Sequence, residues 1–109
     1  KNMICDTKVN LFWILKDGIP TPVTGEESWR EWFEVFNNRV IRQDEIEGCM
    51  ISTIFFGVNH SQSRKPLLYE TSLLLDEDEN PIYRSETEKE ALKIHESLIV
   101  KVKIHAKIK

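Results

Sequence analysis

Polar residues that could do chemistry lie within the most apolar part of this chain, the stretch "STIFFGVNHSQSRKPLLYET" at residues 52–71. The stretch is typical of two strands joined by a polar loop. Because successive side chains of a strand point to opposite faces, Glu70 faces away from Tyr69 and Thr71. If this strand is internal, the Glu70 carboxylate needs a partner, since burying an unpaired charge is very costly.

Two interpretations of these polar residues stay open. In the first, they form a buried network that fixes strand register and docks the loop. In the second, they converge on an aromatic-lined pocket, as in many small-molecule sites, where the hydroxyl, imidazole and cationic groups suit an anion. The candidate partners of Glu70 are Arg39, Arg42, His60, His95 and backbone amides. The candidate ligand-binding residues are Arg39, Thr53, His60, Arg64, Glu70, Thr71 and His95.

Familiar catalytic motifs are absent from the sequence: it has no glycine-rich phosphate loop, G-x-S-x-G, H-E-x-x-H or paired C-x-x-C. The 3 histidines lack metal-ligand spacing, and 2 cysteines are too few for a disulfide framework or a zinc site. We therefore expect no catalytic residue, no metal and no cofactor. The alternative is a small enzyme that uses Glu70 or His95 as a general acid or base.

Length and composition predict one domain over residues 1–109, with 40% hydrophobic and 30% charged residues. No apolar run approaches the roughly 20 residues of a membrane span. The chain opens with no secretory h-region, so we expect a soluble protein of the cytoplasm and no membrane partner. A net charge of −3 argues against a surface for duplex nucleic acid.

The charge is distributed unevenly along the chain. Residues 76–90 hold seven acidic and two basic side chains, whereas residues 91–109 hold five lysines and one glutamate. A solvated acidic loop followed by a basic helix end would explain this, because such charges suit the helix dipole. The alternative is an electrostatic docking surface.

The N-terminal half predicts a strand over residues 9–15 with a turn at Asp17-Gly18, and then an edge strand or extended loop at "IPTPV". Residues 24–39 predict one amphipathic helix that ends near Asn37-Asn38. Its capping boxes would run from Thr24 to Glu27 and from Ser28 to Glu31. We expect its aromatic stripe to be buried and to anchor the core; the stripe comprises Trp29, Trp32, Phe33 and Phe36.

The C-terminal half predicts a hairpin of residues 39–46 and 49–58, whose second, doubly apolar strand is central, and further strands at 67–76 and 82–85. A final helix would begin at capping boxes from Ser85 to Glu88 and from Thr87 to Glu90. Residues 101–109 fit a helix end or a strand. The expected face of this helix comprises Ala91, Leu92, His95, Leu98, Ile99 and Val102. We thus predict an α+β domain with an antiparallel sheet of about four to six strands and two amphipathic helices on one face.

The segments "SWREWFEVFNNRVIR", "GCMISTIFFGVNHS", "LLYETSLLL" and "EALKIHE" together resemble a family of small proteins encoded by bacteriophages and prophages. The resemblance covers roughly residues 11–100 and implies a genomic setting without a mechanism. The lysine-rich tail and the acidic "DEDEN" loop depart from the family pattern. The matching positions are Trp29, Trp32, Phe33, Glu34, Arg39, Val40, Ser52, Thr53, Phe55, Gly57, His60, Glu70, Thr71, Ala91 and His95.

These observations predict a non-catalytic phage accessory protein in the host cytoplasm. We expect it to inhibit host antiphage defence, either by binding a host protein or by sequestering a small anionic, nucleotide-like signal. The alternatives are the small enzyme described above and a structural or oligomer-forming phage protein, a homo-oligomer through strand edges or the aromatic helix.

Overall fold

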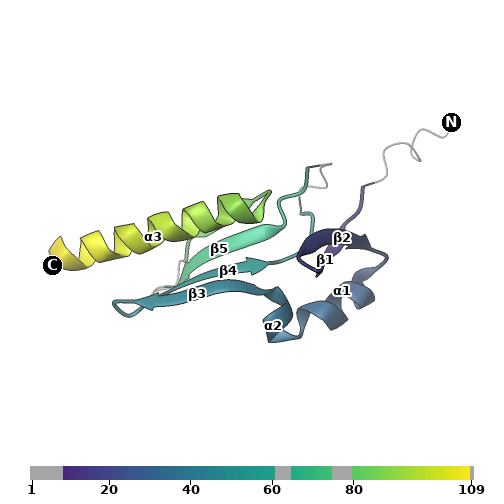
Figure 1. Ribbon diagram of the computed structural model, residues 1–109, viewed down its shortest axis with the longest axis horizontal. Coiled ribbons are helices and arrows are strands. Elements are labelled where there is room, and N and C mark those ends of the chain that lie inside the picture. Colours follow the sequence, from purple (N-terminus) through teal and green to yellow (C-terminus); the bar gives the residue numbers. More distant parts are fainter. Residues whose placement is uncertain (1–8, 61–64, 75–79, 109) are drawn as a thin grey trace.

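The chain forms an elongated α+β domain in the computed structural model, which describes residues 9–60, 65–74 and 80–108 (Figure 1). The principal extents are 62 × 27 × 26 Å. The element order is β1 (Phe12–Lys16), β2 (Ile19–Val23), α1 (Glu26–Phe33), α2 (Phe36–Arg39), β3 (Val40–Ile46), β4 (Cys49–Phe55), β5 (Tyr69–Leu74), β6 (Ile82–Ser85) and α3 (Glu88–Ile108). The predicted fold class is therefore confirmed.

The strands form two antiparallel sheets, a hairpin of β1 and β2 and a four-stranded sheet in the order β3-β4-β5-β6. Each of the two tightest hairpins turns through two residues with positive φ, Asp17-Gly18 and Glu47-Gly48. This backbone matches the right-handed twist of the flanking strands. As predicted, β4 is a central strand of its sheet.

Helix α3 lies along one face of the four-stranded sheet (Figure 1). It begins at the second of the two predicted capping boxes, in which the Glu90 amide donates to Thr87 Oγ1 at 3.1 Å and the Thr87 amide donates to Glu90 Oε1 at 3.3 Å. The first box, from Ser85 to Glu88, does not form, because the Ser85 hydroxyl has no partner among the described residues. The tail that fitted either a helix end or a strand is helical as far as Ile108. Its buried face comprises Ala91, His95, Leu98, Ile99 and Val102, as predicted except that Leu92 is half-buried.

The prediction of a single helix over residues 24–39 is wrong. Helix α1 ends at Phe33, Val35 adopts an extended conformation, and α2 follows as a separate turn. The Asn38 and Arg39 side chains fold back and donate to the carbonyls of Trp32 and Phe33, at 2.9 and 2.7 Å, which satisfies the end of α1.

The expected start and burial of this aromatic helix also differ from the structure. The N-cap of α1 is Gly25, with no side-chain cap, in place of the predicted capping boxes. Trp29, Trp32 and Phe33 are half-buried, and Phe36 is 51% exposed. Helix α1 packs on β1, and its Trp32 ring meets Phe55 edge-on, with ring centroids 5.6 Å apart, beside the cluster that also contains Ala91 of α3.

Residues 56–59 join the two sheets through main-chain contacts. The Trp13 amide donates to Gly57 O and the Asn59 amide donates to Leu11 O, both at 2.8 Å. The Trp29 indole donates to Phe56 O at 2.8 Å. A Cβ on Gly57 would lie 2.3 Å from Trp13 O, so this close approach of two backbones requires glycine.

Candidate functional site

Three of the predicted site residues meet beneath α3. Thr53 on β4 and Thr71 on β5 are directly opposite each other in the sheet, and their hydroxyl oxygens lie 2.9 Å apart. His95 on α3 places Nδ1 2.7 Å from Thr53 Oγ1. All three residues are 0% exposed. The predicted burial of the imidazole is confirmed, and its partner at Nδ1 is the Thr53 hydroxyl, which also contacts the Thr71 hydroxyl.

Asp44 completes this cluster from β3, and the sequence did not single it out. Its Oδ2 lies 2.8 Å from His95 Nε2 and accepts a hydrogen bond from Arg42 Nε at 2.7 Å. The bond from His95, followed by the Arg42 guanidinium, lowers the pKa of the Asp44 carboxyl. Because Asp44 is then ionised, His95 Nε2 carries a hydrogen and donates it.

Arg42 extends the network to the surface, where its Nη1 pairs with Glu96 of α3. The hydrogen bond to Glu96, assisted by Asp44, raises the pKa of Arg42. The same oxygen of Asp44 therefore contacts a buried imidazole and a half-buried cation. The network joins β3, β4, β5 and α3. We call the buried Thr53, Thr71 and His95, together with the half-buried Asp44, the polar rung.

A count of hydrogens links the polar rung to the charge of His95. Thr71 Oγ1 lies 3.3 Å from Ala91 O, so the rung contains four contacts between Asp44 and that carbonyl. With Asp44 ionised, all four contacts hold a hydrogen only when both nitrogens of His95 are protonated. When His95 is neutral, its Nδ1 accepts a hydrogen bond from the Thr53 hydroxyl, and the Thr53 hydroxyl accepts one from the Thr71 hydroxyl. The longest contact, at Ala91 O, is then lost.

The polar rung separates two apolar clusters under α3. One cluster comprises Ile51, Leu98, Ile99 and Val102. The other comprises Phe55, Leu68, Tyr69 and Ala91. A shift of α3 along the sheet would leave the buried hydroxyl and imidazole groups unpaired, at a cost of about 1–3 kcal/mol for each neutral group, and would separate His95 from the half-buried Asp44 carboxylate. The rung therefore fixes the position of α3 on the sheet.

A hydroxyl, an imidazole and a carboxylate in series are also the groups of a nucleophile, a base and an orienting acid. Catalysis would require a substrate atom to reach the hydroxyl of Thr53. Since Thr53 and His95 are both 0% exposed, no substrate can reach that hydroxyl while α3 is in place. The arrangement supports a stabilising role.

Glu70 lies on the other face of the sheet from His95. In the register, Glu70 is opposite Ile54 and Arg84, whereas the next residue, Thr71, belongs to the polar rung. Arg84 Nε donates to Glu70 Oε2 at 2.9 Å, and the Glu70 side chain is 16% exposed. The expectation of a partner is met by Arg84, which was not among the candidates. Convergence of Glu70 and His95 on one pocket is not found.

His60 and Arg39 lie in a third place, beside α1. The exposed His60 ring stacks on Phe56 with ring centroids 5.2 Å apart. The Arg39 guanidinium lies 4.9 Å from the centroid of the Phe33 ring. Arg64, the remaining candidate, lies outside the described residues. The predicted ligand-binding residues are therefore divided among three places. These are the core beneath α3, the face of the sheet opposite α3, which we call the open face, and the aromatic rings of Phe33 and Phe56 beside α1.

A groove of about 530 Å³ lies where β6 meets the start of α3. Arg84 and Lys93 line it, but so do the carboxylates of Glu86 and Glu90. The Ser85 hydroxyl beside it is buried and has no hydrogen-bond partner among the described residues. Two cations and two anions give this groove no preference for an anionic ligand.

Within the described part of the chain, no group of three His, Cys, Asp or Glu side chains could hold a metal ion. Among the same residues, no helix combines the length and apolarity needed to cross a bilayer. No family model, curated protein or solved structure matches the chain.

Proposed function

We propose that this chain is a non-catalytic phage accessory protein that binds a host protein in the cytoplasm and thereby inhibits antiphage defence. The resemblance to small phage-encoded proteins supports the genomic setting. The binding role is supported by a surface of α3, and the rest of the proposal depends on it.

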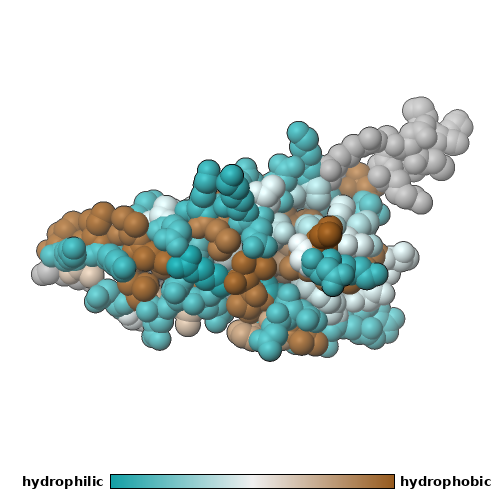
Figure 2. Space-filling view, viewed as in Figure 1, coloured by the Kyte–Doolittle hydropathy of each residue, from teal (hydrophilic) through white to brown (hydrophobic). Residues whose placement is uncertain are grey.

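The observation that carries the proposal is an exposed aliphatic stripe on the C-terminal half of α3. Val100, Ile104 and Ile108 are 52%, 53% and 77% exposed. Figure 2 shows hydrophobic surface over this end of the helix. Single exposed aliphatic residues are ordinary, but three at successive turns of one helix favour an interaction surface.

Binding of a host protein is favoured over capture of a small anion. The residues that would have formed an anion pocket lie apart, and those of the polar rung bond to one another beneath α3. The groove beside β6 holds equal numbers of acidic and basic side chains. The exposed stripe of α3 is therefore a better candidate for the binding site than an internal pocket.

The test is affinity capture from host-cell lysate with three forms of the full chain. These are the wild type, a stripe variant with Val100→Gln, Ile104→Gln and Ile108→Gln, and a control variant with Ile19→Gln and Ile82→Gln. The control residues are 64% and 54% exposed, so the two variants remove similarly exposed aliphatic groups from different surfaces. Glutamine suits a helix, and circular dichroism checks that each variant folds.

We expect the wild type and the control to retain the same host protein and the stripe variant to lose it. Equal retention by the stripe variant would place the binding surface elsewhere and remove the observation on which the proposal depends. A small molecule retained in native mass spectrometry, with no host protein above the level of the tag alone, would overturn the proposal in favour of sequestration.

A further inference from the structure

The aliphatic stripe faces directly away from the sheet. Residues four apart on a helix lie on one side, and the stripe is on the side opposite the buried face of α3. Exposed lysines flank the stripe on both sides, Lys101 on one and Lys103 with Lys107 on the other. The surface is therefore a narrow apolar ridge with a cationic border.

A second copy of this chain is a poor match for the stripe. Antiparallel pairing centred on Ile104 would join the two stripes but would bring the lysine borders of both copies together. Pairing centred between Leu98 and Ile99 would place Ile104 beside Lys93 of the other copy. The first arrangement costs like-charge repulsion and the second buries an aliphatic residue against a charged one.

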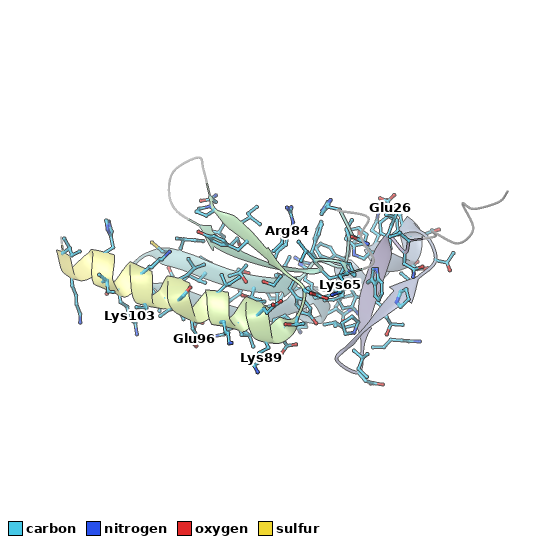
Figure 3. All side chains as sticks on the ribbon, turned by 90° about the horizontal axis from the view of Figure 1, so that it is seen from above. Glu26, Lys65, Arg84, Lys89, Glu96 and Lys103 are labelled. Atoms are coloured by element: carbon cyan, nitrogen blue, oxygen red, sulfur yellow. The ribbon has the colours of Figure 1, made fainter. Side chains whose placement is uncertain are left out.

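An anionic lipid surface is a poor match as well. The outward side of α3 continues from the stripe past Glu96 and Glu90, both exposed. Figure 3 shows Lys89, Glu96 and Lys103 along one edge of the helix. A flat anionic surface that contacts the lysines would also contact the carboxylates of Glu90 and Glu96, which it would repel. The stripe also lacks the aromatic residues typical of helices that lie in a lipid interface.

We propose that the C-terminal half of α3 docks an acidic amphipathic helix of the partner protein. This inference rests on the proposed function and names its partner class. A helix with aliphatic residues at spacings of three and four would cover Val100, Ile104 and Ile108, and carboxylates beside them would pair with the lysine border. Toward the N-terminus of α3, the cationic border of Lys101, Lys103 and Lys107 is followed by Glu96, which is paired with Arg42.

The test uses two synthetic helical peptides of the length of α3 that share one Ile/Leu stripe. One peptide carries Glu beside the stripe and the other carries Lys. Fluorescence anisotropy measures the affinity of each for the full-length wild type, for a charge variant with Lys101→Glu, Lys103→Glu and Lys107→Glu, and for a control with Lys16→Glu, Arg30→Glu and Lys65→Glu, three exposed positions outside α3.

We expect the wild type and the control to bind the Glu peptide about tenfold more tightly than the Lys peptide, because three exposed ion pairs replace three repulsive contacts. The charge variant should invert the preference, and added salt should weaken the preference in every form. The stripe variant should bind neither peptide.

Equal binding of both peptides by the wild type would overturn the inference. So would sedimentation of the wild type with vesicles of phosphatidylglycerol and phosphatidylethanolamine, or a dimer in analytical ultracentrifugation that Ile104→Gln abolishes. Failure of the peptide preference with host capture intact would leave the proposed function standing. A clear peptide preference with no captured host protein would overturn the proposed function alone.

Discussion

The Nδ1 atom of His95 lies 2.7 Å from the hydroxyl oxygen of Thr53, and both residues are 0% exposed. The contact joins a helix to the central strand of the sheet across 42 residues of sequence. Because no water reaches either group from the surface, the loss of one partner leaves the other unsatisfied. We therefore expect the polar rung to be sensitive even to conservative substitution.

Thr53→Val tests this sensitivity with almost no change of shape. The variant removes the hydroxyl that bonds to His95 and Thr71, and we expect it to lower the free energy of unfolding by about 1–3 kcal/mol. Urea denaturation measures the change. Thr21→Val is the control, since the Thr21 hydroxyl bonds at an exposed position on β2. A loss no greater than that of the control would contradict the importance of the rung.

Asp44 gives the domain a defined dependence on acid. Its pKa is lowered in the folded state, so its stabilising contribution is complete above its unfolded pKa of about 4 and is lost as the pH falls through the lower folded value. We expect Asp44→Asn to be less stable than the wild type at pH 7 and to show a shallower decline between about pH 5 and pH 2. Parallel declines measured by urea unfolding at each pH would refute this.

Gly57→Ala should destabilise the joint between the two sheets by more than about 1 kcal/mol, because glycine alone adopts its positive φ without strain and a Cβ would meet Trp13 O. Gly25→Ala is the matched control: its φ of +86° is as positive, but nothing lies within 4 Å of the added Cβ. The difference in thermal midpoint between the two variants reports the contact with Trp13. No difference would mean that the two backbones separate at little cost.

Glu70→Gln should have a small effect. The carboxylate pairs with an Arg84 side chain that is 43% exposed, and a pair of this kind contributes about 0–1 kcal/mol. We expect the free energy of unfolding to fall by less than in Thr53→Val, with the circular dichroism spectrum unchanged. A larger loss for Glu70→Gln would show that the open face of the sheet, and not the polar rung, holds the more sensitive polar group.

Much of the fold could be predicted from local patterns. The turns at Asp17-Gly18 and Glu47-Gly48, the central position of β4 and the cap at Thr87 each depend on a few neighbouring residues. The break between α1 and α2 depends instead on side chains that fold back onto the end of α1, and periodicity does not record such contacts. The aromatic spacing of that segment fits one helix as well as two.

Only part of the candidate site could be predicted, because local patterns give the face on which a side chain lies but not its long-range partner. Strand alternation placed Thr71 and Glu70 on opposite faces, and helical spacing placed His95 on a buried face. Which residues of neighbouring strands lie on the same face depends on the strand register. In β3 the register shifts at a bulge between Val40 and Arg42. That register places Arg42 beside Thr53 and Asp44 beside Ile51. The sequence could not indicate that Asp44 would reach His95.

The main-chain joint at Gly57 determines how the two sheets respond to heat. The hairpin of β1 and β2 is too small to persist alone, and its backbone is bonded to the segment that leaves β4. Melting of either sheet would therefore remove support from the other. Spectroscopic probes placed in the hairpin and in the four-stranded sheet should therefore report a single, coincident unfolding transition. A partner that binds the C-terminal end of α3 would then also protect the distant hairpin from proteolysis.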